Sequence, residues 1–256
     1  MDDFSGWDGA ALVTGGSGGI GRAVVRLLAR RGSDVAFTWR TDEAAAMALA
    51  DELSSYGGRV SAHQLDTGDQ LACGQVVAEV LEYHGLMHTL VHAVGPHVPM
   101  VHLSNLEPAA MEAQLSADAA GFFNVVRPAL APLRSAEGSI VAVTTAATSR
   151  FPVRDGLSSV PKAAVEAIMR ALAVEEGRYG VRVSCVGPGM LTDGMAQRLI
   201  ESGELDERAL QAARDNIPLR RFGIAHDVAE AVCFLASPRA GFISGQKLDV
   251  DGAYGA

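Results

Sequence analysis

Lysine is almost missing from this chain of 256 residues. Lys162 and Lys247 are the only two, and arginine supplies the rest of the 21 basic residues. Positive charge is also outnumbered, because 30 acidic residues leave a formal net charge of −9 and a pI near 5.2. This balance argues against nucleic acid or an anionic membrane surface as the main partner. Any anionic ligand must be held by local features of the chain.

Cysteine is equally scarce. Cys73, Cys185 and Cys233 are odd in number, far apart and never spaced as CxxC, so neither a disulfide framework nor a zinc knuckle is expected. No apolar run reaches the ~18 residues of a membrane-spanning helix. The opening MDDFSGWDG has neither the basic nor the apolar region of a secretory signal. We therefore expect a reduced, cytoplasmic protein that does not enter a membrane.

Hydrophobic residues make up 48% of the chain, enough for a sizeable core. Short β-branched runs alternate with longer helical patterns. The expected strands are 11–15, 34–40, 59–66, 87–95, 138–145, 181–189 and 246–252. The expected helices are 20–32, 42–58, 69–85, 157–179, 192–214 and 225–237, and 108–134 is mostly helical. Seven strands that alternate with helices predict parallel pairing with helices on both faces of the sheet.

The pattern predicts a single doubly wound α/β domain over residues 1–256, because no linker or break in composition interrupts it. The segment of about 190–216 is expected to form a mobile lid over the substrate. TGGSGGIG (14–21) lies between the first expected strand and the first helix. Glycines in such a turn let the backbone approach a ligand closely, and the N–H groups of the following helix face an anion.

The turn reads TGxxxGIG, and in this respect the chain resembles the short-chain dehydrogenase/reductase family. LDTGD (65–69), HAVG (92–95) and VGPG (186–189) resemble further motifs of that family, and 217–252 resembles its C-terminal third. The resemblance covers essentially the whole chain. It implies a Rossmann fold with a seven-stranded parallel sheet, a nicotinamide cofactor, a small-molecule substrate and assembly as a homotetramer or homodimer through the helices at 108–134 and 157–179.

The resemblance also assigns cofactor contacts to Gly15, Ser17, Gly19, Ile20, Gly21, Arg40, Asp66, Thr67, His92, Gly95, Lys162, Pro188, Gly189 and Thr192. In Rossmann folds, an acidic residue at the end of the second strand binds the ribose 2′-OH of NAD, whereas a nearby arginine accommodates the 2′-phosphate of NADP. Here that position is Trp39, followed by Arg40, which favours NADP(H). Two observations stay open: Gly18 stands where NADP-using relatives often carry a basic residue, and Arg40 could be a solvated surface charge.

Members of the family protonate the product from a tyrosine four residues before the lysine, and a serine and an asparagine assist. Carried over residue by residue, the lysine is Lys162, the serine is Thr145 and the asparagine is Asp118. The tyrosine position holds Ser158. The chain thus keeps the lysine and a hydroxyl but lacks the phenol, whose pKa near ~10 makes it a far better acid than an aliphatic alcohol.

Reduction of a conjugated olefin tolerates this loss better than reduction of a ketone, because the enolate oxygen needs only hydrogen-bond donors. The sequence therefore predicts an NADP(H)-dependent reductase of an enoyl or activated carbonyl compound. The alternative is a catalytically silent cofactor-binding subunit, or a non-redox lyase, isomerase or cyclase on the same fold. Enoyl and dienoyl reductases of the family take their tyrosine from other positions, which here are Asp155 and Ala147.

Other groups are weaker candidates. Five histidines (His84, His88, His92, His97 and His102) lie close in sequence. His84 ends an expected helix whereas His88 and His92 alternate on an expected strand, which argues against a shared metal shell, and we expect no metal. His97 and His102 could donate a proton or simply face solvent. Asp155 could be an acid of raised pKa or a loop carboxylate beside Arg154. Ser159 to Lys162 spells the S-x-x-K of some hydrolases, and Lys247 is expected to have no role.

Overall fold

Seven parallel strands form one sheet at the centre of the computed structural model, which describes residues 3–95, 98–193 and 207–256. The strands are β1 (Ala10–Thr14), β2 (Asp34–Trp39), β3 (Val60–Gln64), β4 (Met87–His92), β5 (Ser139–Val143), β6 (Arg182–Pro188) and β7 (Lys247–Val250). They pair in the order β3-β2-β1-β4-β5-β6-β7, every pair parallel, which confirms the predicted sheet. The strand order reverses between β1 and β4, the place where open α/β sheets bind ligands.

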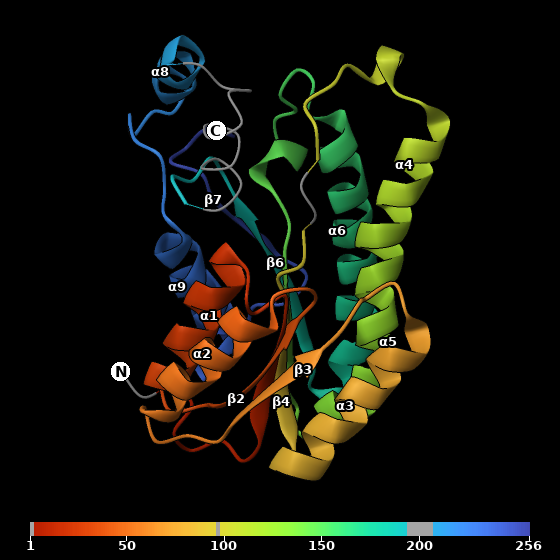
Figure 1. The fold of residues 1–256 in the computed structure, drawn as a ribbon, viewed down its shortest axis with the longest axis vertical. Helices are drawn as coiled ribbons and strands as arrows, with labels where there is room; N and C mark the ends of the chain where they lie inside the picture. The colour runs from red at the N-terminus through yellow and green to blue at the C-terminus, as the bar shows by residue number, and fades with distance from the viewer. Residues whose placement is uncertain (1–2, 96–97, 194–206) are drawn as a thin grey trace.

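Helices cover both faces of this sheet (Figure 1). On one face lie α1 (Gly19–Arg30), α2 (Glu43–Ser54) and α9 (Ala225–Ala236); on the other lie α3 (Gln70–His84), α5 (Gly121–Ser135) and α6 (Gly156–Glu176). α4 (Pro108–Leu115) precedes α5, and α8 (Glu207–Asp215) precedes α9. No helix within the described ranges is long and apolar enough to cross a membrane.

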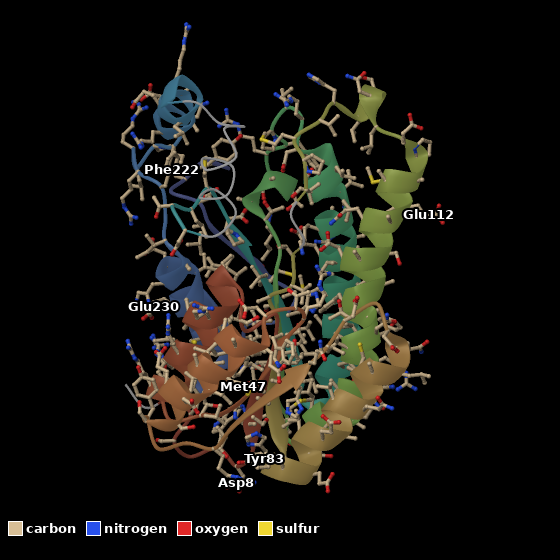
Figure 2. The ribbon with its side chains drawn as sticks, viewed as in Figure 1. Asp8, Met47, Tyr83, Glu112, Phe222 and Glu230 are labelled. Carbon is tan, nitrogen blue, oxygen red and sulfur yellow. The ribbon has the colours of Figure 1, made fainter. Side chains whose placement is uncertain are left out.

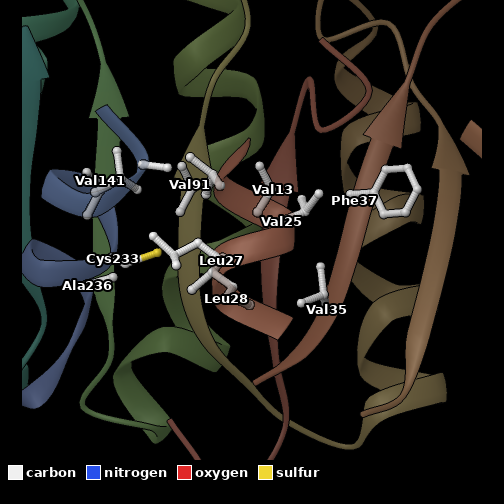
Figure 3. Close-up of a cluster of buried hydrophobic side chains, with 14 of the residues drawn as sticks. Val13, Val25, Leu27, Leu28, Val35, Phe37, Val91, Val141, Cys233 and Ala236 are labelled. Carbon is white, nitrogen blue, oxygen red and sulfur yellow. The ribbon is translucent and has the colours of Figure 1, made fainter. Parts of the chain in front are cut away.

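Two apolar clusters hold the helices to the sheet. In Figure 3, Val13, Val91 and Val141 project from neighbouring strands toward α1 and α9. On the opposite face, Leu12, Leu90 and Ile140 meet side chains of α3, α5 and α6. Successive strand residues point to opposite faces, and both faces are covered, so the central strands are apolar almost throughout. This burial keeps the strand ends, which carry the candidate site, in fixed register.

The helical segment predicted at 108–134 is interrupted. Residues Ser116–Ala120 form a π-helical turn between α4 and α5. Such turns are rare in proteins, and those that occur are often found at functional sites. This one carries Asp118, and it places that side chain in the interior, where it is 2% exposed. Of the predicted helix and lid at 190–216, residues 194–206 lie outside the described ranges.

Candidate functional site

The glycine-rich turn joins the end of β1 to the start of α1. Gly15 has a left-handed φ of +72°, and a Cβ at this position would lie 2.8 Å from the carbonyl oxygen of Ala93. A Cβ at Gly21 would lie only 2.1 Å from the carbonyl oxygen of Gly15. Both positions therefore require glycine. A side chain at either position would force the turn away from the start of α1 or from the segment after β4.

The start of α1 offers unpaired backbone donors. Its N-cap, Gly18, has no side chain to accept from the first N–H groups, and no acidic residue lies in the first turn. The predicted residues Gly19 and Ile20 occupy this end of the helix, and the carbonyl of Ser17 accepts a hydrogen bond from Arg22 Nη2 at 3.2 Å. A helix start with free N–H groups and no competing carboxylate suits a pyrophosphate.

The end of β2 presents a cation and no carboxylate. Trp39 is 8% exposed and belongs to the apolar cluster on the α1 face. Arg40 is exposed, and its backbone carbonyl accepts from Gln64 Nε2 at 3.1 Å, which fixes the backbone and leaves the guanidinium in solvent. Thr38 Oγ1 accepts from Gly15 N at 3.0 Å, so this strand end and the glycine turn form one rim.

Two further residues that were predicted to contact the cofactor, Asp66 and Thr67, lie after β3. Asp66 is exposed, and its Oδ1 accepts from Gly68 N at 2.9 Å in a tight turn. Thr67 is 7% exposed, and its carbonyl accepts from Asn124 Nδ2 of α5 at 3.0 Å. The sequence reasoning missed Asn124. An asparagine on the helix after the π turn, facing a loop backbone, has no local pattern that would reveal it.

His92 is packed inside the sheet. Its Nδ1 lies 2.9 Å from Thr14 Oγ1, and its ring meets Phe122 edge-on with a centroid distance of 5.2 Å. Burial lowers the pKa of His92 to about 3, and the charge of Lys162 adds to this effect. The imidazole is therefore neutral at physiological pH. A contact between the cofactor and this residue stays a prediction.

Lys162 and Asp118 form a buried ion pair. The Lys162 ammonium donates to Asp118 Oδ1 at 2.7 Å and to the carbonyl of Val94 at 2.9 Å. The second carboxylate oxygen of Asp118 accepts from Gln114 Nε2 at 2.8 Å. Within the described residues, two of the three N–H bonds of the ammonium are thus engaged, which leaves one for a ligand hydroxyl. The structure thus brings Lys162 and Asp118 into contact. In the sequence they were connected only because they stand at the family's lysine and asparagine positions.

Gly95 follows Val94 over the same lysine, since a Cβ at Gly95 would lie 3.8 Å from Lys162 Nζ. Thr145 is half-buried just after β5, and its Oγ1 accepts from Ala147 N at 3.1 Å. The proton of the Thr145 hydroxyl remains available for donation. Ser158 lies one helical turn before Lys162 on α6, so both residues face the same side. The Ser158 hydroxyl is half-buried and forms no hydrogen bond within the described part of the chain.

The end of β6 forms the other side of the site. Pro188 ends the strand, and Gly189 N donates to the carbonyl of Val250 at 2.9 Å. A Cβ at Gly189 would lie 2.7 Å from the Cα of Asp251, so this turn also needs glycine. Thr192 N donates to the carbonyl of Gly223 at 2.9 Å. The predicted residues of this turn therefore lie on a rigid backbone.

Three of the four tyrosines lie away from the carboxyl ends of the strands, where the candidate site is. Tyr56 follows α2, Tyr83 lies in the last turn of α3, and Tyr179 follows α6. Each helix returns toward the start of the next parallel strand, so these rings lie at the amino edge of the sheet. Figure 2 shows both Tyr83 and Asp8, which precedes β1, at the lower end of the molecule.

The fourth tyrosine, Tyr254, follows β7 and lies at the carboxyl edge. The guanidinium of Arg150 lies 4.7 Å above its ring centroid, and Arg150 Nη1 donates to its carbonyl at 3.0 Å. The expectation that no phenol reaches the reacting centre stays a prediction, and Tyr254 is the residue that tests it.

Asp155, at the N-cap of α6, is half-buried and makes no cap hydrogen bond to the helix. Arg154 does not neutralise it by an ion pair, because that guanidinium donates to the carbonyl of Met100 at 2.6 and 3.1 Å. Burial raises the pKa of Asp155 to about 6. Asp155 thus forms no ion pair with Arg154 within the described residues, and its burial favours the alternative of an acid of raised pKa.

This shift predicts a pH-dependent stability. An unfolded aspartate titrates near ~3.9, so between this value and about 6 the folded chain binds more protons at Asp155. The free energy of unfolding should then fall as pH rises through this window. Asp155→Asn removes the effect, and urea denaturation from pH 4 to 7 should show the variant gaining on the wild type as pH rises. A difference that stays constant with pH would contradict the assignment.

The remaining predictions diverge. Within the described ranges no group of histidine, cysteine and acidic residues could hold a metal. His84 bonds Ser61, with Nε2 and Oγ 3.0 Å apart, and His88 stacks on Phe4. His97 lies outside the described residues. Lys247, for which no role was expected, has a side chain that is only 13% exposed and that contacts hydroxyls and carboxylates.

Comparison with known proteins shows that nearly the whole chain is similar to oxidoreductases. A family model described as enoyl-(acyl carrier protein) reductase matches residues 15–255. A versicolorin reductase of Emericella nidulans is 31% identical over 248 residues, 94% of each chain. A 3-oxoacyl-(acyl-carrier-protein) reductase of Staphylococcus aureus is 30% identical over 244 residues, 95% of this chain and 96% of its own. A solved short-chain dehydrogenase of Burkholderia cenocepacia in complex with NADP has a TM-score of 0.88 and 30% identity, covering 98% of this chain and 99% of that one.

Proposed function

This chain belongs to the short-chain dehydrogenase/reductase family of oxidoreductases, and we propose that it uses NADP(H) to reduce a conjugated enoyl compound or another activated carbonyl compound. One observation carries the proposal: Lys162 is retained and Thr145 keeps a hydroxyl at the serine position, while Ser158 stands at the tyrosine position. Such a site holds a cofactor and a substrate oxygen but has little acid to give.

The residues present fit a dinucleotide. The glycine cradle, which a Cβ at Gly21 would fill, exposes backbone N–H groups for the pyrophosphate. The remaining N–H of Lys162 would hold a ribose hydroxyl, and Arg40 would meet a 2′-phosphate. A bound NADPH would supply the hydride. The hydroxyls of Thr145 and Ser158 then act as donors to the substrate oxygen as negative charge develops on it.

Protonation decides the substrate class. An alkoxide formed from a ketone needs an acid at the oxygen, and aliphatic hydroxyls are far weaker acids than a phenol of pKa ~10. An enolate is less basic, and its carbon can take the proton from water. The enone is therefore the favoured substrate. NADPH oxidation in the presence of an enoyl thioester tests the proposal.

The second candidate function is a silent cofactor-binding subunit. The engagement of Lys162 by Asp118 and Val94 favours it, because less of the ammonium is free to support chemistry. Fluorescence titration that shows NADPH binding, with no oxidation by any enone or ketone, would select this candidate. A non-redox lyase or isomerase would bind NADPH and convert its substrate without oxidising the NADPH.

The cofactor preference gives a separate prediction. Arg40→Ala should weaken NADPH binding at least about tenfold, since it removes the cation that meets the 2′-phosphate. NADH binding should change by less than about twofold because NADH lacks that phosphate. Isothermal titration with both nucleotides measures this. An equal loss for both would show that Arg40 does not select the cofactor.

We also propose assembly through α5 and α6. Phe123 on α5 is 46% exposed and Val174 on α6 is 83% exposed, which leaves apolar surface on both helices. Sedimentation of the purified chain measures the oligomeric state.

A further inference from the structure

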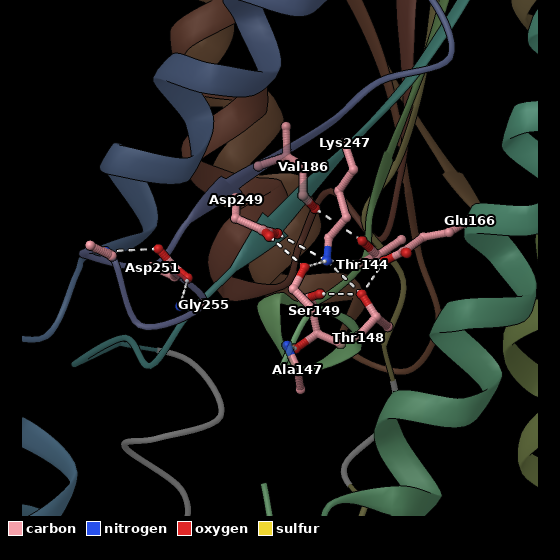
Figure 4. A network of polar contacts seen from close by, with 12 residues as sticks. Thr144, Ala147, Thr148, Ser149, Glu166, Val186, Lys247, Asp249, Asp251 and Gly255 are labelled. Carbon is pink, nitrogen blue, oxygen red and sulfur yellow. Dashed lines mark hydrogen bonds and ion pairs between the residues drawn. The ribbon is translucent and has the colours of Figure 1, made fainter. Parts of the chain in front are cut away.

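Lys247 lies at the start of β7, at the centre of a polar network (Figure 4). Its ammonium donates to Thr148 Oγ1 and, at 3.0 Å, to Ser149 Oγ. It also lies 3.0 Å from Asp249 Oδ1 and 3.5 Å from Glu166 Oε1. The two hydroxyls in turn bond the two carboxylates. Thr148 Oγ1 donates to Glu166 Oε1 at 2.7 Å, and Ser149 Oγ donates to Asp249 Oδ2 at 2.7 Å.

The network is buried enough to make its charge balance matter. The side chains of Lys247 and Glu166 are 13% and 8% exposed, and that of Asp249 is 25% exposed. One ammonium therefore stands between two carboxylates with little water to screen them. Without it, Glu166 would remain buried beside a second negative charge, a costly arrangement.

This network reaches the candidate site through two segments. Thr148 lies in the short helix Ala146–Thr148 that follows Thr145, and its hydroxyl also lies 3.1 Å from the Thr145 carbonyl. On the other side, a Cβ at Gly187 would lie 2.6 Å from Lys247 Cε, so the strand that ends in Pro188 packs directly on the lysine. Glu166 follows Lys162 by one turn of α6.

We propose that Lys247 is a positioning residue for Thr145. By holding Thr148 and Ser149, the ammonium fixes the segment 145–149 against β7 and α6. The Thr145 hydroxyl thereby keeps its hydrogen bond from Ala147 N and directs its own proton toward the substrate oxygen. The catalytic part of this inference rests on the proposed function, whereas the ordering of the segment does not.

A double-mutant cycle separates positioning from general stability. Lys247→Met should lower kcat for enone reduction between about tenfold and a hundredfold, because small displacements of a catalytic donor have effects of this size. NADPH affinity should change less than about threefold, since Arg40 and the glycine turn lie at the other half of the sheet. In a Thr145→Ala background, Lys247→Met should change kcat by less than about twofold. Equal losses in both backgrounds would overturn the inference.

Arg31→Met is the matched control. Arg31 is another little-exposed basic residue, paired with Glu230 and Asp3 after the end of α1, remote from the strand ends. Its loss should lower the melting temperature but leave kcat within about twofold of the wild type. If Lys247→Met does not fold, Lys247→Met/Glu166→Gln removes the uncompensated carboxylate and enters the same cycle. Lys247→Arg keeps the charge and should recover part of kcat.

Amide hydrogen exchange distinguishes failure of this inference from failure of the proposed function. If the wild type oxidises no NADPH, the proposed function fails, but the positioning is still read from Ala147 N. Its exchange should accelerate at least about tenfold in Lys247→Met and stay unchanged in Arg31→Met. Unchanged exchange in Lys247→Met would overturn the inference whatever the activity.

Discussion

Lys162→Met is expected to lower the free energy of unfolding by about 3–5 kcal/mol, because it removes one partner of a buried ion pair. Asp118 is 2% exposed, and of its side-chain hydrogen bonds to the described residues it would keep only the one from Gln114 Nε2. Cofactor binding should weaken at least about tenfold, since the ammonium is the only side-chain cation beside Gly95 within the described residues. Urea denaturation and NADPH titration of the same preparations measure both effects.

The double variant Lys162→Met/Asp118→Asn identifies the cause. It pairs a neutral amide with a neutral side chain, so it should regain most of the lost stability while binding NADPH as poorly as the single variant. If Lys162→Met is as stable as the wild type, or if the double variant is no better than the single one, the ion pair does not hold the site together.

Gly21→Ala should abolish measurable NADPH binding and lower the free energy of unfolding by about 1–3 kcal/mol, as overpacking does. The added Cβ would lie 2.1 Å from the Gly15 carbonyl oxygen and 2.9 Å from the Gly16 Cα. These are backbone atoms and cannot rotate away, so α1 must move off the turn. Its N–H groups would then no longer converge on the pyrophosphate.

Gly18→Ala is the control for this change. Its nearest contact would be 3.3 Å, to the same Gly15 oxygen, and its backbone φ of −76° suits any residue. The thermal midpoint of Gly18→Ala should stay close to that of the wild type. If Gly21→Ala matched Gly18→Ala in melting temperature and NADPH affinity, the tight turn would not be the binding element.

The sequence predicted the sheet well because its central strands are buried on both faces and are therefore rich in apolar residues, between longer helical patterns. It also predicted the glycine turn, because Gly15 and Gly21 belong to one short continuous motif whose geometry depends on neighbouring residues. Both features depend on short-range patterns. The π turn at Ser116–Ala120 was missed, because a helix that gains one residue per turn differs little in composition from its neighbours.

Long-range polar contacts were also beyond prediction. Lys247 and Glu166 are 81 positions apart, and nothing near either residue indicates that they share a network. Asn124 and Thr67 are similarly distant. The sequence left open whether Asp155 is an acid of raised pKa or a loop carboxylate beside Arg154. The burial of Asp155 and the hydrogen bonds from Arg154 to the Met100 carbonyl are visible only in the fold.

The ratio of kcat/KM for a conjugated enone to that for its saturated ketone, with NADPH as reductant, tests the central claim most directly. The account predicts a ratio above about one hundred for the wild type and for Tyr254→Phe, and a much smaller ratio for Ser158→Tyr, which restores a phenol of pKa ~10 beside Lys162. A wild type that reduces both substrates equally well, or that loses its activity in Tyr254→Phe, would contradict it.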